Sequence, residues 1–203
     1  MIDLEALAVT AEMPARLGAS SLAVDAGRER LWCANFMDHT VTIVDTAADR
    51  VLRHLAVGAF PCKVAAHPGS GRGYVAYSHS GAIGVLDLHR PSLLGEISVP
   101  GAPVGVSLSA SGERLYVADR SAGALGVVDL ASGTEWARVA VGAGPGDVIV
   151  DPGSDLVSCP TPVTGPSPCS ETASLALRPH RRRPALPLTT WSAGGSRPSP
   201  CRR

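Results

Sequence analysis

The sequence predicts an all-β fold, a partial β-propeller built from four-stranded antiparallel blades. Shifting the 203-residue chain against itself by 42 residues aligns like residues with like and needs no insertion. The positions that align are Pro61 with Pro103 and Pro145, Ala34 with Ala76 and Ala118, Asp45 with Asp87 and Asp129, and Val57 with Val99 and Val141. A fixed period of about 40 residues with four short apolar runs per unit is typical of a propeller blade.

The stretch 102–142 displays one unit most clearly. Its four apolar runs of about six residues are separated by small or turn-forming residues, and runs this short favour strands over helices. The predicted strands, named a to d in chain order, are Val104–Ser109, Arg114–Asp119, Ala124–Asp129 and Glu135–Val141. Gly123, in the turn between strands b and c, is expected to adopt a positive φ.

Strands b and c of this unit are apolar on both faces, as the segments LYVA and LGVV indicate. Such strands are expected where a sheet is covered on both sides, which is the case for blades stacked face to face. Gly105 and Gly126 are expected to let neighbouring sheets approach closely.

Three complete blades and the start of a fourth are predicted over residues 19–155. The first unit runs from Ala19 to Gly58 and the second from Phe60 to Pro100. Residues 1–18 align with the end of a strand c and a strand d, so they are expected to supply the outer part of a preceding blade. Three blades and a fraction do not close a ring, and the open blade faces therefore predict self-association.

Residues 156–203 lose the repeat and are predicted to be a disordered tail rich in Pro, Arg and Ser. Residues 1–155 carry 17 acids and 11 bases, a net charge of −6, whereas the tail carries 1 acid and 7 bases, a net charge of +6. We also expect a frame shift near Asp155, because the codons for residues 158–171, read one base early, can spell VSNTGDGTVSVL in register with a blade. The parent would then be a longer, closed propeller.

Two features bear on partners and location. The basic segment RPHRRR at 178–183 suits phosphate-rich polymers, but Trp191 alone accompanies it, so no specific nucleic-acid recognition is predicted. No run approaches the roughly 18 apolar residues of a membrane span. The N-terminus lacks the pattern of a secretory signal, which predicts a cytoplasmic chain as it stands.

The segments LYVAD, GYVAY and LWCAN, each followed by a VVD-like strand c and a V-G-x-G-P-like link, resemble the YVTN-type β-propeller repeat. The resemblance covers about 150 residues. It implies a propeller fold and leaves function broad: members include surface-layer and secreted binding proteins. Similar propellers serve as subunits of quinone- or haem-dependent oxidoreductases and as lactonases. For a full-length parent the resemblance also allows a secreted or periplasmic location.

The b–c turns and d–a links of a four-stranded meander share one rim, where ligands commonly bind. The candidate binding residues on this rim are Asn35, Asp38, His39, Lys63, Tyr77, His79, Asp119, Arg120 and Asp147. No catalytic residue, metal or cofactor is predicted. An alternative is that His39 and His79 approach one another on adjacent blades and bind a metal with Asp38. The competing interpretation is that hairpin tips are polar because they face water.

Other polar residues and the cysteines have structural interpretations. The repeated Asp45, Asp87 and Asp129 are expected to accept backbone N–H groups in turns, and His67 is expected to be a turn residue on the opposite rim. Cys33 is predicted to be a buried apolar filler that forms no bridge to Cys62. The three tail cysteines follow no metal-ligand spacing.

No P-loop, G-x-S-x-G, H-E-x-x-H or dinucleotide fingerprint is present in the sequence. The rims are rich in Gly, Ser, Ala and Asn and bring no acid–base set together. The sequence therefore favours a non-catalytic binding or scaffold propeller whose partner is a protein or a small molecule. The alternative is a fragment of a propeller enzyme or redox subunit, lactonase-like or quinone- or haem-dependent, whose active rim is built from several blades.

Overall fold

A computed structural model of the chain describes residues 2–151, 153–154 and 156–162. This part of the chain forms three four-stranded antiparallel sheets and two two-stranded ones, with a single 3-10 turn, η1 (Ala26–Arg28), as its helical content. The predicted all-β fold of four-stranded blades is confirmed. Within the described residues, no helix is long and apolar enough to cross a membrane.

Each four-stranded sheet is one blade, and its strands follow one another across the sheet in chain order. The first blade comprises β3 (Ala19–Asp25), β4 (Arg30–Asn35), β5 (Thr40–Asp45) and β6 (Arg50–Ala56). The second comprises β7 (Pro61–His67), β8 (Arg72–Tyr77), β9 (Ala82–Asp87) and β10 (Ser92–Ser98). The third comprises β11 (Pro103–Leu108), β12 (Arg114–Asp119), β13 (Ala124–Asp129) and β14 (Thr134–Ala140).

The two short sheets keep the register of the repeat. At the N-terminal end, β1 (Ile2–Asp3) pairs with β2 (Ala8–Val9), and Ile2 opposite Val9 lies one period before Val44 opposite Val51. β1 and β2 therefore occupy the repeat positions of the end of a strand c and the start of a strand d.

At the other end, β15 (Ile149–Val150) pairs with β16 (Val157–Ser158), and Val150 opposite Val157 lies one period after Leu108 opposite Leu115. These residues occupy the strand a and strand b positions of a fourth blade. Strand pairing thus continues past Asp155, so Val157 and Ser158 belong to the fourth sheet and not to the predicted tail. The rest of that tail, residues 163–203, lies outside the described residues.

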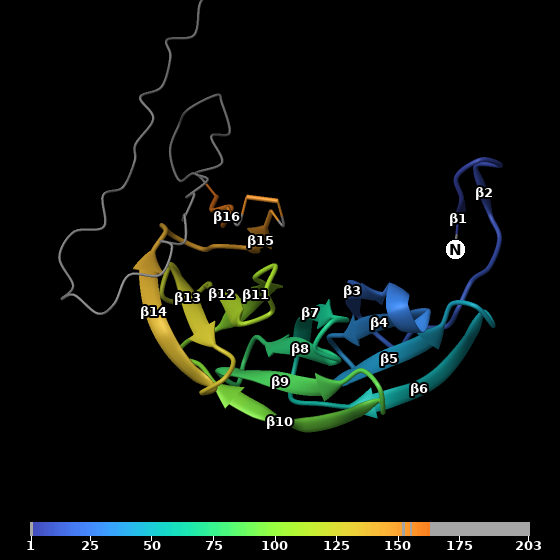
Figure 1. The fold of residues 1–203 in the computed structure, drawn as a ribbon, viewed down its shortest axis with the longest axis horizontal. Helices are drawn as coiled ribbons and strands as arrows, with labels where there is room; N and C mark the ends of the chain where they lie inside the picture. The colour runs from blue at the N-terminus through green and yellow to red at the C-terminus, as the bar shows by residue number, and fades with distance from the viewer. Residues whose placement is uncertain (1, 152, 155, 163–203) are drawn as a thin grey trace, which may run out of the picture.

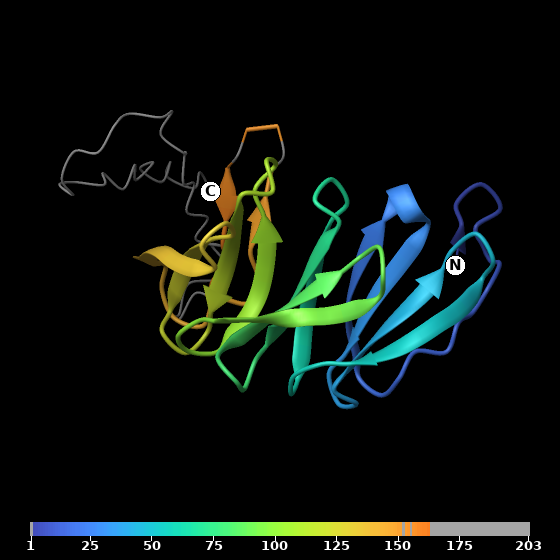
Figure 2. The same ribbon diagram turned by 60° about the horizontal axis from the view of Figure 1, so that its bottom comes forward.

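The blades stack face to face along an arc, with β3, β7 and β11 on the inner side and β6, β10 and β14 outside (Figures 1 and 2). The core lies between consecutive sheets. The first interface includes Trp32, Ile43, Val64 and Leu86, the second includes Tyr74, Ile83, Val106 and Leu115, and the third includes Leu125, Val127, Val148 and Val157. Burial on both faces of strands b and c accounts for their continuous apolar sequence.

Polar hydrogen bonds add to the stacking at the inner strands. Ser20 Oγ donates to the carbonyl of Pro61 in the next blade at 3.2 Å, and Cys62, one period later, donates through Sγ to the carbonyl of Pro103 at 3.4 Å. Cys33, Cys62 and Cys159 are free, and Cys33 is buried as predicted. The same contact is thus made by a hydroxyl at one interface and by a thiol at the next.

The repeated aspartates have the predicted structural role. In each of the three blades, the aspartate Oδ1 accepts a backbone N–H from the turn that follows it. The bonds run from Ala48 to Asp45 at 2.9 Å, from His89 to Asp87 at 2.8 Å and from Ser132 to Asp129 at 2.8 Å. Backbone hydrogen bonds of this kind lower the pKa of Asp87 and of Asp129. On the same rim, His67 Nδ1 accepts the backbone N–H of Ser70 at 3.1 Å, which confirms it as a turn residue.

Candidate functional site

One rim of the arc is formed by the b–c turns and the d–a links, as predicted, and a repeated hydrogen bond ties the two together. The N–H of Phe36 donates to the carbonyl of Gly18 at 2.8 Å in the first blade. Its equivalents one and two periods later are Ser78 to Phe60 at 3.2 Å and Arg120 to Ala102 at 3.1 Å. Each b–c turn is therefore fixed against the link that enters its own blade.

The b–c turn has one position in the left-handed region, which glycine fills twice and histidine once. Gly81 and Gly123 have φ of 60° and 59°, as expected for Gly123, whereas His39 has φ of 54° at the same repeat position. Phe60 on the neighbouring link is also left-handed, with φ of 55°. Non-glycine residues in this region carry backbone strain and are over-represented at functional sites.

His39 and Phe60 hold one another in these conformations. The backbone N–H of Phe60 donates to His39 Nδ1 at 3.0 Å, and the two rings meet edge to face with centroids 4.7 Å apart. The His79 ring packs on the Phe60 ring with centroids 4.4 Å apart. The Phe36 ring also contacts the Phe60 ring, with centroids 5.2 Å apart. We call Phe36, His39, Phe60 and His79 the rim cluster. Both histidines are exposed and both phenylalanines half-buried, so the cluster faces solvent.

The rim cluster brings His39 and His79 to the same place, but Phe60 contacts both imidazoles. Asp38 does not join them: its carboxylate accepts Thr40 Oγ1 at 3.0 Å and lies 3.9 Å from Arg16 Nε. No group of three His, Cys, Asp or Glu side chains among the described residues is placed to hold a metal ion. The cluster therefore offers ring faces and imidazole nitrogens instead of a ligand set.

Lys63 and Asp147, both predicted rim residues, form an ion pair with Nζ and Oδ2 2.6 Å apart. They occupy the same repeat position on the second and fourth blades, with Gly105 at that position between them. A Cβ on Gly105 would lie 2.8 Å from Asp147 Cα, so the glycine permits a close approach, as predicted. About a third of each side chain is exposed, and the two charges neutralise one another.

Three other predicted rim residues share one repeat position, the last residue of strand b, and all three are buried. Asn35 donates through Nδ2 to Thr42 Oγ1 at 2.8 Å, and Tyr77 packs on Gly58 and Gly84, where a Cβ would overlap its ring. Asp119 pairs with Arg138 Nη1 at 2.7 Å. The Asn35 amide and the Asp119 carboxylate are used in these internal contacts, whereas the Tyr77 hydroxyl is buried with no hydrogen-bond partner among the described residues. None of the three is accessible to a ligand in this conformation.

The electrostatics of two buried groups follow from this packing. Burial pushes the pKa of Asp119 upward, but hydrogen bonds from the Ala102 N–H, from Arg138 and from Ser121 outweigh it and bring the pKa to about 2. Burial raises the pKa of Tyr77 to about 12. At neutral pH Asp119 is charged and paired, and Tyr77 is neutral.

The thiols near the rim are poor nucleophiles. Burial raises the pKa of Cys62 to about 11, although Arg120, the remaining predicted rim residue, acts in the opposite direction from its exposed position. Burial also raises the pKa of Cys159 to about 11. Since the thiolate is the reactive form, neither cysteine suits nucleophilic catalysis at neutral pH.

Sequence reasoning selected both histidines of the rim cluster but missed Phe36 and Phe60. A signal was present: these are the chain's two phenylalanines, and each lies in a predicted rim segment, one in a b–c turn and one in a d–a link. Two aromatic residues in segments that meet on one rim form a cluster, which is more informative than the polar residues that are common in turns.

Comparisons with known proteins support the fold. No family model and no curated protein matches the sequence. Among solved structures, hydrazine synthase from Kuenenia stuttgartiensis is similar at a TM-score of 0.68 and 25% identity, over 73% of this chain and 43% of that one. A functionally unknown protein from Desulfotomaculum acetoxidans is similar at a TM-score of 0.64 and 14% identity, over 71% of this chain and 49% of that one. The chain thus spans less than half the length of either structure, and its stacked four-stranded sheets are β-propeller-like.

Proposed function

We propose that this chain is a binding module of the YVTN-repeat type that holds a partner on its rim without catalysing a reaction. The observation that carries the proposal is the rim cluster, in which the Phe60 ring contacts two exposed imidazoles. Two of its residues sit in strained left-handed backbone, and one of them, His39, replaces a glycine of the repeat. Glycine at this position would relieve the backbone strain, so the presence of histidine argues for a role of its side chain.

The charged residues of the rim support a binding role over catalysis. Lys63 pairs with Asp147, and Asp119 pairs with Arg138, so these carboxylates and bases are engaged with one another. A carboxylate, lysine or arginine held in an ion pair is not free to exchange a proton with a substrate, so these four side chains do not suit general acid–base catalysis. The cluster instead suits a ligand or peptide that carries a flat ring, which stacks on Phe60, and an anionic or accepting group, which bonds the imidazoles.

The test is a screen of aromatic carboxylic acids and of short peptides carrying Phe or Tyr beside Asp or Glu, by saturation-transfer difference NMR. Wild-type protein is expected to bind members of this set, and Phe60→Ala is expected to lose the signal. Met37→Ala is the matched control, because Met37 is an exposed apolar residue in the b–c turn that carries Phe36 and His39. Equal binding by wild type and Phe60→Ala would contradict the proposal.

A second variant separates binding from folding. His39→Gly restores the glycine of the repeat and relieves strain of about 1 kcal/mol, while it removes one hydrogen bond of similar value. Stability is therefore expected to change by less than about 1 kcal/mol, and binding to fall at least tenfold. Unchanged affinity in His39→Gly would mean that the imidazole has no part in recognition.

A fragment of a propeller enzyme or redox subunit is the second candidate, favoured by the likeness to a chain of hydrazine synthase. On this reading the rim needs residues from blades that are not part of this chain. Metal analysis of the purified protein, with lactonase and dye-linked dehydrogenase assays, tests it. Turnover that is lost in His39→Ala would favour the enzyme over the binding module.

A further inference from the structure

The two short sheets at the ends of the arc are complementary halves of one blade. β1 and β2 occupy the strand c and strand d positions, whereas β15 and β16 occupy the strand a and strand b positions. Every complete blade has the order a, b, c, d, with strand b paired to strand c. Among the residues that the structure describes, each half therefore presents the edge that the other half pairs with in a complete blade.

Three of the exposed apolar residues lie where the missing pairing would cover them. Leu22 on β3 is 61% exposed, although its repeat equivalents Val64, Val106 and Val148 are at most 3% exposed because a preceding blade packs on them. Ile2 on β1 is 67% exposed, although its equivalents Val44, Leu86 and Val128 are at most 4% exposed. Ile149 on β15, on the outward face of the fourth sheet, is 59% exposed.

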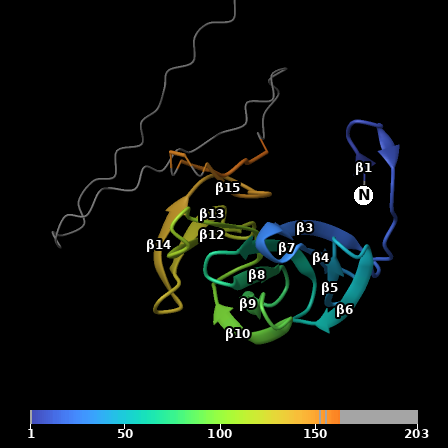
Figure 3. The ribbon, with the colours of Figure 1, turned by 45° about the vertical axis from the view of Figure 1, so that its right-hand side comes forward.

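The two halves of one chain lie at opposite ends of the arc, with the three blades between them (Figures 1 and 3). They cannot complete a blade with one another in this arrangement. A second copy can bring its own halves to both ends. Three blades plus one shared blade make four per copy, so two copies make a ring of about eight, within the range in which propellers close.

We propose that two copies of this chain associate head to tail and close one ring, with β15–β16 of each copy completing a blade with β1–β2 of the other. The association is heterologous but closes after two copies, so it gives a symmetric dimer and no open fibre. Two-fold closure produces two identical junctions. This proposal does not depend on the rim ligand.

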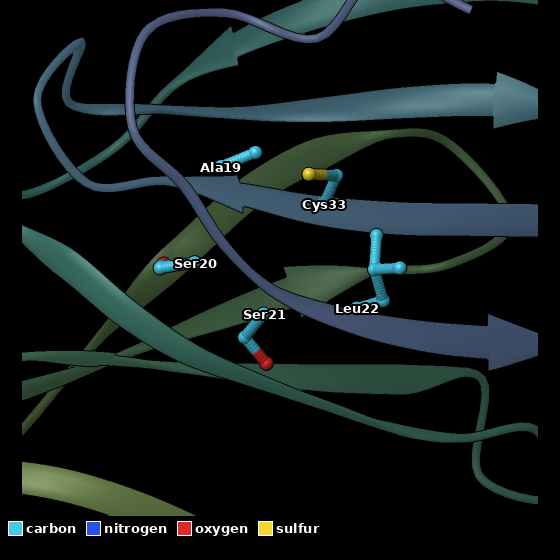
Figure 4. Close-up of a pocket in the computed structure, with 5 residues that line it drawn as sticks. All are labelled: Ala19, Ser20, Ser21, Leu22 and Cys33. Atoms are coloured by element: carbon cyan, nitrogen blue, oxygen red, sulfur yellow. The ribbon is translucent and has the colours of Figure 1, made fainter. Parts of the chain in front are cut away.

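The repeat fixes the contacts at each junction. Leu115 pairs with Val128 within the third blade, so Val157 of one copy pairs with Ile2 of the other. Ala23 and Val64 share a core cluster between the first and second blades, so Ile149 of one copy packs on Leu22 of the other. Figure 4 displays the receiving surface, an open hollow where Leu22 lies beside Cys33 on the neighbouring strand.

The test is the mass of the full chain in solution, by light scattering coupled to gel filtration and by sedimentation over a range of concentrations. The expected result is a discrete species of twice the 20.8 kDa chain mass. Leu22→Asp and Ile2→Asp place a carboxylate at both junctions, so each is expected to raise the dimer dissociation constant at least about a hundredfold. Both residues are exposed in the single chain, so neither change should disturb the β-type circular-dichroism spectrum.

Leu94→Asp is the matched control, because Leu94 is a similarly exposed apolar residue on the outer strand β10, away from both junctions. It is expected to leave the dimer intact. A monomer at all concentrations, larger open assemblies, a dimer unaffected by Leu22→Asp, or a dimer broken by Leu94→Asp would each overturn the proposal.

Discussion

Lys63 on the second blade and Asp147 on the fourth form a 2.6 Å ion pair, and Gly105 of the third blade packs against Asp147. The three residues occupy one repeat position on consecutive blades. A side chain at the middle position would separate the charges, so the bridge exists because that position holds glycine. The pair thereby ties the start of the fourth sheet to the inner wall of the arc.

Gly105→Ala is therefore expected to destabilise the protein. Its Cβ would lie 2.8 Å from Asp147 Cα and 3.0 Å from the carbonyl carbon, and backbone atoms at this distance must move. Overpacking of this kind costs about 1 to 3 kcal/mol in the free energy of unfolding, measurable by urea denaturation. Gly95→Ala, where a Cβ meets no heavy atom within 4 Å, is the control and should cost much less.

The ion pair itself is expected to contribute modestly. Each side chain is about one-third exposed, so solvent screening limits the coupling energy to roughly 0.5 to 1 kcal/mol. A double-mutant cycle with Lys63→Met and Asp147→Asn measures it, and the coupling should shrink as salt is added. A coupling energy of zero at low salt would show that the Lys63–Asp147 pair does not stabilise the protein.

The pKa of Asp119 predicts an acid-dependent loss of stability. Its folded pKa of about 2 lies below the unfolded value of about 3.9, so its contribution is complete above pH of about 4 and is lost as the pH falls toward 2. Since one pKa unit is worth about 1.4 kcal/mol, the contribution is on the order of 2 to 3 kcal/mol. Asp119→Asn should lower stability by that amount at pH 7 and by little at pH 2. The same loss at both pH values would show that the effect is not electrostatic.

The thiol of Cys159 reports on the order of the fourth sheet. Burial raises its pKa to about 11, and the side chain is fully covered. In native protein at pH 8, iodoacetamide should therefore modify Cys159 and Cys62 far more slowly than in urea, as followed by peptide mass spectrometry. Equal rates for Cys159 in both conditions would mean that β16 does not pack on the third blade.

Most of the architecture was predictable because the repeat and its breakers are local signals. The bounds of β12 and β13 match the predicted strands b and c, since small residues close both ends. β11 and β14 each begin and end one residue before the predicted positions. β16 was missed because VSCP at 157–160 differs in composition from LYVA, which stands one period earlier. Within VSCP the two buried positions, Val157 and Cys159, still hold apolar residues.

The site was harder to predict, because the presence of a polar residue at a strand end does not reveal the direction of its side chain. Asn35, Tyr77 and Asp119 were expected on the rim but are buried, since partners on strands c and d meet them inside the sheet. Gly126 was expected to admit a neighbouring sheet, yet its closest contacts are Glu135 and Arg138 of its own sheet. The residues that contact each of these side chains are determined by tertiary packing, which the 42-residue period alone does not encode.

Residue-resolved hydrogen exchange of the full chain tests the stacked-blade account most directly. Slow amides are expected in Val104–Leu108, in Leu115–Ala118 and at the positions one and two periods earlier, because these strands are paired within a sheet. All of them are also packed between two sheets except those of the first blade, where β3 has one open face in the single chain. The three blades should then repeat one protection pattern at an interval of 42 residues. Protection that does not follow this interval, or fast exchange throughout β8 and β12, would contradict the account.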